Sequence, residues 1–219
     1  RYVAFEGLDR TQPTETTEPF GASIPLEKAL QPDVLLAFDM NDAPLLPAHG
    51  FPLRVIVPGY IGARSVKWLG AIKVQSEPSD SYFQQQAYRL PSSDGDMLGT
   101  LTVNSIIYTP QVGQVFAPGK LTVRGFAWAG ENTVARVEVS IDEGQNWQEA
   151  VLLDPPTPWT WRRWHLNVEL DDGSHILIVR ARDSQGRTQP ENIDTLWNSK
   201  GYMNNAYHRV SIRVCDSTA

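Results

Sequence analysis

The feature that most constrains the fold is a series of short β-rich runs that fills the second half of the chain. From Leu101 to Val214 these runs alternate with turn signals, and each has the length of a single strand. They are LTVNSII, KLTVRGFAWAG, ARVEVSID, WHLNVEL, HILIVRARD and HRVSIRV. About seven strands at such spacing are typical of two packed antiparallel sheets, so we expect an all-β immunoglobulin-like sandwich in this half.

The pattern within and between these runs supports that expectation. In ARVEVSI the apolar and polar residues alternate, which is the period of a half-buried strand. The connections DEGQNW, LDDGSH and DSQGRT place Asp and Gly where tight turns need them, so we expect neighbouring strands to pair as hairpins. The tryptophans of this half are expected in the core or on a sheet face rather than stacked on a ligand: Trp128, Trp147, Trp161 and Trp164.

The first half predicts a mixed α+β structure with much irregular chain. SIPLEKAL has Ser23 as a candidate N-cap, with Pro25 near the first helical position, and so predicts a short helix. VLLAFDM predicts a strand, and FPLRVIVPGYIG predicts a second apolar run that Pro58 and Gly59 close. Residues 79–99 are rich in Gln, Ser, Asp and Pro, which predicts a linker and a domain boundary near Gly99.

Charge and composition limit the function only in part, since the net charge leaves room for a local basic pocket. The formal net charge of −6 argues against a large basic surface for nucleic acid or an anionic membrane, and no apolar run approaches the roughly 18 residues of a membrane span. Cys215 is the only cysteine, so neither an internal disulfide nor a cysteine metal cluster can form within this chain. The chain has no nucleophile elbow, phosphate-binding P-loop, dinucleotide fingerprint or paired-histidine zinc motif.

One group of polar residues in the first half occupies positions where the local sequence pattern predicts apolar residues. The group contains Asp9, His49, Arg54, Arg64 and Lys67. Because several of these donors lie near glycine-rich turns, they could converge on an anion such as a phosphate. The alternative is that Arg54 and Lys67 are exposed ends of a two-sided strand and His49 is a satisfied polar residue. The other histidines, in or beside the strands of the second half, are interpreted as structural: His165, His175 and His208.

Long strings of the sequence resemble one family of molybdenum enzymes, the eukaryotic-type sulfite oxidases and assimilatory nitrate reductases. The strings are GASIPLEKAL, VLLAFDMNDAPLLPAHGFPLRVIVPGYIGARSVKWLGAI and LWNSKGYMNNAYHRV, and the similarity covers nearly the whole chain. The resemblance implies that residues 1–99 are the C-terminal portion of a molybdopterin-binding oxidoreductase domain. It also implies that residues 100–219 are an immunoglobulin-like molybdenum-cofactor oxidoreductase dimerisation domain, through which the protein forms a homodimer.

The resemblance also assigns roles to individual residues. Six positions match the family's molybdopterin contacts: Asp9, His49, Arg54, Ser65, Val66 and Lys67. Tyr88 matches the active-site tyrosine, and Tyr82, six residues earlier, is the competing candidate. Lys200 stands where sulfite oxidases place a substrate-binding arginine, and it keeps the positive charge but loses the two-pronged guanidinium fork.

The expected reaction is the two-electron oxidation of sulfite to sulfate at molybdenum held by molybdopterin, with electrons passing to an unidentified acceptor. A nitrate reductase of the same family is one alternative, and a cofactor-free fragment that acts only as a dimerisation module is the other. The family's molybdenum-ligating cysteine lies upstream of the EGLD segment, and this chain begins after that position. The cofactor site is therefore expected to be incomplete in this chain, and the isolated chain to be inactive.

Overall fold

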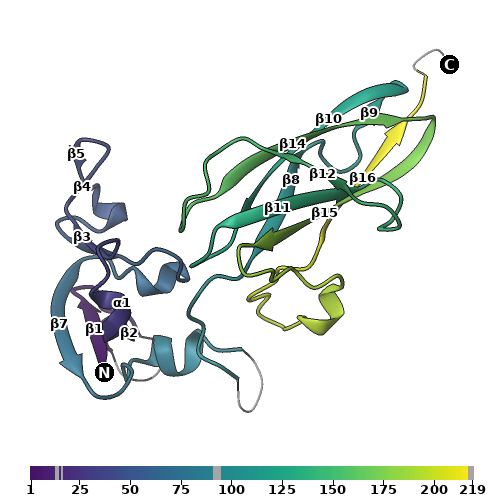
Figure 1. The fold of residues 1–219 in the computed structure, drawn as a ribbon. Coiled ribbons are helices and arrows are strands. Elements are labelled where there is room, and N and C mark those ends of the chain that lie inside the picture. Colours follow the sequence, from purple (N-terminus) through teal and green to yellow (C-terminus); the bar gives the residue numbers. More distant parts are fainter. Residues whose placement is uncertain (13–14, 16, 91–94, 217–219) are drawn as a thin grey trace. The chain divides into compact units, whose positions relative to one another are not determined.

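The computed structural model describes all residues except 13–14, 16, 91–94 and 217–219, and most of its regular structure is β-strand. The chain divides into two compact units, Arg1–Thr100 and Leu101–Ala219, which we describe separately (Figure 1). Among the described residues no helix is both long enough and apolar enough to cross a membrane.

A three-stranded antiparallel sheet forms the centre of the first unit. Its central strand is β1 (Tyr2–Gly7), which pairs with β2 (Gly21–Pro25) on one side and β7 (Leu69–Gln75) on the other. Apolar side chains from this sheet pack with those of the segment 55–66 in one small core. The buried members of this core are Val3, Phe5, Ala22, Ile24, Val55, Val57 and Val66.

Short elements fill the rest of the first unit (Figure 1). The strands β3 (Leu35–Ala37) and β6 (Arg54–Ile56) pair with each other, as do β4 (Asp39–Met40) and β5 (Ala43–Pro44). The helical pieces are α1 (Leu26–Ala29), the 3₁₀ turns η1 (Pro47–His49) and η2 (Gly62–Arg64), and the π-helix η3 (Phe83–Ala87).

Three local predictions for the first unit were wrong in detail. Ser23 is not a helix N-cap, because it lies inside β2, and the helix α1 begins only after Pro25. The backbone of 21–25 is satisfied by pairing with β1, which leaves only four residues for the helix. VLLAFDM is broken into β3 and β4. The segment 79–99, which was expected to be a linker, carries the π-helix η3. Residues 91–94 of that predicted linker lie outside the described residues.

The second unit contains two sheets. One has the order β13-β14-β10-β8, and the other has the order β12-β11-β15-β16-β9. All described strand pairs in this unit are antiparallel except β16 with β9, which is parallel. The bounds are β8 (Asn104–Thr109), β9 (Val115–Phe116), β10 (Gly119–Trp128), β11 (Val134–Ser140), β12 (Gln148–Glu149), β13 (Val151–Leu152), β14 (Arg162–Leu170), β15 (Gly173–Asp183) and β16 (His208–Val214).

All six runs singled out from the sequence form strands, and the short β9, β12 and β13 were not expected. The DEGQNW turn joins the antiparallel pair β11 and β12, as predicted. The LDDGSH turn does not make a hairpin, because β14 and β15 belong to different sheets. A tight turn reverses the chain locally, but it does not decide whether the next strand pairs with its predecessor or crosses to the other sheet.

Both sheets of the second unit contribute to a single apolar core around Trp164, whose side chain is fully buried. Gly125 lies directly opposite in the paired strand β10, and a Cβ there would stand 2.1 Å from the Trp164 ring and 2.0 Å from the carbonyl oxygen of Ile106. Only glycine therefore fits beside this tryptophan. Trp161, by contrast, is 65% exposed and packs on Phe126 with ring centroids 5.5 Å apart.

Candidate functional site

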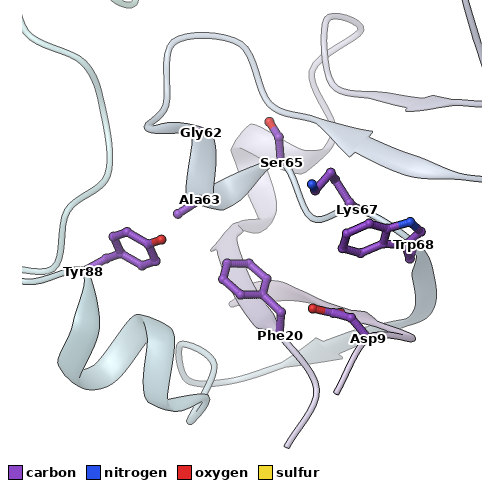
Figure 2. A pocket seen from close by; sticks show the side chains of 8 residues that line it. All are labelled: Asp9, Phe20, Gly62, Ala63, Ser65, Lys67, Trp68 and Tyr88. Carbon is purple, nitrogen blue, oxygen red and sulfur yellow. The ribbon is translucent and has the colours of Figure 1, made fainter. Parts of the chain in front are cut away.

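The first unit contains a cavity of about 300 Å³ into which several of the sequence-predicted site residues project (Figure 2). Four of its lining residues were predicted, namely Asp9, Ser65, Lys67 and Tyr88. Figure 2 shows the Tyr88 phenol and the Lys67 ammonium entering from opposite sides, with the Phe20 ring between them. The remaining lining residues were not predicted: Phe20, Gly62, Ala63 and Trp68.

The pairing of β1 with β7 explains why Asp9 and Lys67 line the same cavity although they are 58 positions apart in the sequence. Asp9 follows the end of β1 and Lys67 precedes the start of β7, and the Leu8 amide donates a 2.7 Å hydrogen bond to the Trp68 carbonyl oxygen. A Cβ on Gly7 would clash with the Asp9 carboxylate. Glycine at this position therefore lets the carboxylate fold back over the strand end.

The segment 48–54 is tied to the segment 65–67 by hydrogen bonds from two cations. The Arg54 guanidinium donates to the carbonyl oxygens of His49, at 3.0 Å, and Ser65, at 3.3 Å. The Lys67 ammonium donates to the Ala48 carbonyl oxygen at 3.1 Å. Gly50 permits this approach, because its φ of +104° suits glycine and a Cβ there would stand 2.9 Å from the Lys67 Cβ.

Three of the predicted cofactor residues hold a buried polar atom that has no hydrogen-bond partner within the described chain. These atoms are Asp9 Oδ1, His49 Nδ1 and Arg54 Nε. A buried polar atom without a partner costs about 1–3 kcal/mol, and such atoms are rare in native proteins. The only others among the described residues are Ser81 Oγ and Trp164 Nε1. Of these three residues only Asp9 lines the cavity, whereas His49 and Arg54 are not among the lining residues. Unmet donors and acceptors in this unit fit a polar ligand that carries both hydrogen-bonding edges and negative charge.

Two residues of the same segment point away from the cavity. The Val66 side chain is 1% exposed and belongs to the core, so any contact that Val66 makes with a ligand goes through its backbone. Arg64 is 3% exposed and donates to the Gln84 side-chain oxygen at 3.2 Å and to the Leu98 carbonyl oxygen. Burial lowers the pKa of the Arg64 guanidinium. The sequence grouped Arg64 with the anion-binding residues, whereas its hydrogen bonds lie inside the fold.

The structure distinguishes the two candidate tyrosines. Tyr88 follows the last residue of η3 and lines the cavity, with its hydroxyl turned inward (Figure 2). Tyr82 precedes the same π-helix and is not among the lining residues, and its ring meets Phe83 edge-on at 5.7 Å. π-Helical turns are rare and occur frequently at functional sites.

Lys200 belongs to the second unit, in the loop between the 3₁₀ turn η4 (Ile193–Thr195) and β16. Its ammonium lies 5.6 Å from the centroid of the Tyr202 ring. A buried side chain, Gln189, which lies between β15 and η4, holds the end of this loop: the Gln189 amide nitrogen donates to the carbonyl oxygens of Asn205 and Ala206.

Two of the three histidines of the second unit, His175 and His208, have hydrogen-bond partners in the backbone. His208 Nδ1 accepts a 3.1 Å hydrogen bond from the Ile107 amide, and burial lowers the pKa of His208, which favours the neutral ring that such an acceptor requires. His175 Nε2 lies 2.8 Å from the Asp171 carbonyl oxygen. Within the described residues no group of three or more His, Cys, Asp or Glu side chains could hold a metal ion.

The cavity residues that sequence reasoning missed are apolar or small and carry no pattern of their own. Phe20 packs on Phe83 with ring centroids 4.6 Å apart, which fixes one wall of the cavity against η3. Trp68 donates its indole N–H to the Pro47 carbonyl oxygen, and the Lys67 ammonium stands 4.3 Å from the Trp68 ring centroid. The adjacent Lys–Trp pair in SVKW was the available signal, since cations often stack on tryptophan.

Comparison with known families gives one match to each half of the chain. Residues 1–83 match the oxidoreductase molybdopterin binding domain, and residues 96–215 match the Mo-co oxidoreductase dimerisation domain. The second match alone covers more than half of the chain.

Individual relatives agree with these family matches. The chain is 42% identical to mitochondrial sulfite oxidase of Mus musculus, over 97% of this chain and 42% of that protein. It is 37% identical to sulfite oxidase of Arabidopsis thaliana, over 98% of this chain and 60% of that protein. It is 36% identical to nitrate reductase [NADH] 2 of Phaseolus vulgaris, over 98% of this chain and 27% of that protein. The chain therefore spans only part of the length of each of these relatives.

Among solved structures, the chain resembles the sulfane dehydrogenase SoxCD from Paracoccus pantotrophus. The TM-score is 0.83 at 30% sequence identity, and the match covers 97% of this chain and 55% of that chain.

Proposed function

The chain belongs to the molybdopterin oxidoreductase family that includes sulfite oxidases and nitrate reductases, and from that membership we propose that it is part of a molybdenum enzyme that oxidises sulfite to sulfate. The observation that carries this proposal is the cavity of the first unit. Asp9, Ser65, Lys67 and Tyr88 line it, and the unmet buried atoms of Asp9, His49 and Arg54 belong to the residues proposed to hold the cofactor.

The side chains present fit molybdopterin. Its phosphate is an anion, and Arg54 and Lys67 supply two cations that hydrogen bonds to backbone oxygens already orient. A pterin edge offers N–H donors, for which Asp9 Oδ1 is a buried acceptor without a partner in the described chain. His49 Nδ1 and the backbone of 65–67 complete the proposed set, in which Val66 takes part through its backbone alone.

Two further side chains, Tyr88 and Lys200, are proposed to interact with the substrate. Molybdenum bound to molybdopterin supplies the two-electron chemistry, and the acceptor that receives the electrons is unidentified. Tyr88 is proposed as the catalytic hydrogen-bond donor, because its phenol reaches into the cavity. Lys200 is proposed to attract the sulfite anion as a point charge, which gives weaker geometric selection among small oxyanions than an arginine fork would give.

We assign residues 1–99 to the C-terminal portion of the molybdopterin-binding domain and residues 100–219 to an immunoglobulin-like sandwich that forms the homodimer. Two sheets with one shared core support the sandwich, and the dimerisation-domain match supports the dimer. Light scattering on residues 101–219 should give the mass of a dimer at micromolar concentration. A monomer for this fragment and for the whole chain would contradict the assignment.

Two other functions fit less well. Reduction of nitrate is the reaction of a related enzyme, but the chain is 42% identical to the Mus musculus sulfite oxidase and 37% identical to the Arabidopsis thaliana sulfite oxidase, against 36% for the Phaseolus vulgaris nitrate reductase. A role as a dimerisation module alone gives no reason for the cavity of the other unit or for the unmet buried polar atoms in that unit.

The test is Arg54→Ala in the full-length protein that contains this chain, with Arg124→Ala as the matched control. Arg124 is an exposed arginine on β10 in the second unit. Molybdenum per chain and pterin fluorescence after gel filtration should fall in Arg54→Ala and remain at the wild-type level in Arg124→Ala. Full retention in Arg54→Ala would remove this residue from the cofactor site, and nitrate reduction without sulfite oxidation by the wild type would select the alternative reaction.

A further inference from the structure

We propose that Arg64 is a positioning residue for the active-site tyrosine: its buried guanidinium braces both ends of the segment that presents Tyr88 to the cavity. The proposal rests on the proposed function, in which Tyr88 meets the substrate. Arg64 itself does not line the cavity, although its neighbours Gly62, Ala63 and Ser65 do.

A chain of hydrogen bonds connects Arg64 to Tyr88 from two directions. One nitrogen, Nη2, donates to the Leu98 carbonyl oxygen, and the Leu98 amide donates a 2.9 Å hydrogen bond to the Tyr88 carbonyl oxygen. The other, Nη1, donates to the side-chain oxygen of Gln84 inside η3, and the Tyr88 amide closes that π-helix on the Phe83 carbonyl oxygen at 2.9 Å. The backbone N–H and C=O of Tyr88 are therefore both fixed by elements that Arg64 holds.

The helix side of the brace is anchored to the central sheet. The Gln84 side-chain oxygen also accepts the Ser23 amide of β2, and its side-chain nitrogen donates to Ser23 Oγ at 2.9 Å. Ser23 Oγ in turn accepts the Ser79 amide at 2.8 Å. Gln84 is 3% exposed, so these bonds lie in the interior and resist competition from water.

Arginine is the side chain that this geometry requires. Its planar fork reaches two acceptors at once, whereas a lysine ammonium can keep the charge but cannot span both in a fixed plane. No carboxylate forms an ion pair with Arg64 among the described residues, and its printed hydrogen bonds go to two neutral oxygens, those of Gln84 and Leu98. A buried cation of this kind is costly to keep, which is consistent with a requirement of function rather than of stability.

The first arm of the test is kinetic and uses the cofactor-loaded full-length protein. Arg64→Lys should lower kcat for sulfite by roughly 100-fold, the loss that a misplacement of about 1 Å can cause, with KM within about twofold of wild type. The matched control is Arg162→Lys, because Arg162 also donates to two backbone oxygens, those of Asp154 and Val134, both at 2.7 Å, but in the second unit. Its kcat should equal that of wild type.

A double-mutant cycle separates positioning from general damage. If Arg64 acts through Tyr88, Arg64→Lys should lower kcat little further in a Tyr88→Phe background, because the group being positioned is already lost. Equal fold losses in both backgrounds would overturn the proposal. If Arg64→Lys fails to fold, the same cycle is run with Gln84→Leu, which removes the acceptor for Arg64. Gln84→Glu is the conservative variant: it keeps an acceptor for Arg64 and should retain kcat.

The second arm does not depend on activity. Hydrogen–deuterium exchange of the full-length protein should show the Tyr88 and Leu98 amides exchanging faster in Arg64→Lys, with the Phe5 amide of β1 unchanged. Unchanged protection of Tyr88 and Leu98, or equal loss at all three amides, would overturn the brace. If the wild type does not oxidise sulfite, the proposed function fails, and the exchange result still decides whether Arg64 holds the Tyr88 segment.

Discussion

The two units differ in the size of their apolar cores and in how many of their buried polar atoms have hydrogen-bond partners. The second unit has a core of eighteen buried apolar residues drawn from both of its sheets, whereas the described residues of the first unit form a core cluster of seven. The first unit also holds four of the five buried side-chain atoms without a partner in the described chain, and three of them belong to its candidate site.

Buried polar groups in the second unit are extensively paired instead. Glu138, for example, is almost fully buried and forms ion pairs with Arg136, Arg180 and Arg182. A unit with a large core and paired charges has what it needs to fold, whereas a unit with a small core and unmet donors depends more on what binds to it. We infer that the second unit contributes most of the stability and the first unit the binding site.

The largest expected effect is a cavity in the core of the second unit. Trp164→Ala should lower the free energy of unfolding of that unit by about 3–5 kcal/mol, because a fully buried side chain is removed from a packed core. Chemical denaturation followed by circular dichroism measures the loss. Trp161→Ala is the control, since a side chain that is 65% exposed should cost far less.

The division of roles predicts a different outcome for the first unit in that same variant. Molybdenum content should be unchanged in Trp164→Ala wherever the protein remains folded, because the cavity residues and the second core share no residue. Loss of cofactor from a folded Trp164→Ala protein would show that the two units do not separate binding from stability.

Removal of the cofactor should lower the thermal stability of the first unit. A ligand held at a thousand times its dissociation constant stabilises the unit that binds it by about 4 kcal/mol, so calorimetry should show one transition moving to lower temperature in cofactor-free protein. The transition that Trp164→Ala shifts should stay in place. If both transitions moved together, the cofactor would stabilise the whole chain, and the comparison between the units would lose its meaning.

The next effect is on turnover alone. Tyr88→Phe removes one hydrogen-bond donor and little volume, and should lower sulfite turnover by roughly ten- to a thousandfold while molybdenum stays bound. Tyr82→Phe is the matched control, because Tyr82 directly precedes the same π-helix but does not line the cavity. Unchanged kinetics in Tyr88→Phe together with a loss in Tyr82→Phe would reverse the assignment of the tyrosines.

How much the sequence could predict also differs between the units. In the second unit the strands followed from alternation and turn residues, because each strand buries one face against a large core. The sheet order did not follow, since the LDDGSH turn gives no sign that the chain crosses between sheets. The very short strands β9, β12 and β13 have too few residues to show a period.

In the first unit the family resemblance identified Asp9, Lys67 and Tyr88, and the structure places all three around one cavity. Residue chemistry alone grouped Arg64 with them, because side-chain direction cannot be inferred from a short irregular segment. The role of Gln84 was equally hidden, since its partners Ser23 and Arg64 are 61 and 20 residues away in the chain. Contacts of this kind are set by the tertiary fold and leave no local pattern.

The smallest expected effect is on the stability of the second unit at low pH. Hydrogen bonds from Arg163 to the Asp154 carboxylate lower the pKa of Asp154 from 3.8 to about 2. A carboxyl whose pKa is lower in the folded state contributes stability above its unfolded pKa, and that contribution is lost as pH falls through the folded value. Asp154 should therefore stabilise the second unit above about pH 4 and cease to do so as the pH falls towards 2.

Asp154→Asn should consequently flatten the dependence of stability on pH between about 4 and 2, because the titrating group is gone. Urea unfolding at a series of pH values, followed by tryptophan fluorescence, measures this in the second unit, which contains six of the seven tryptophans. Asp172→Asn, in the turn between β14 and β15, is the control and should keep the wild-type profile. The ion pair between Arg163 and Asp154 lies at the surface, where the arginine side chain is 61% exposed. Identical profiles for Asp154→Asn and wild type would mean that solvent screens this pair and that it contributes nothing to the stability of the second unit.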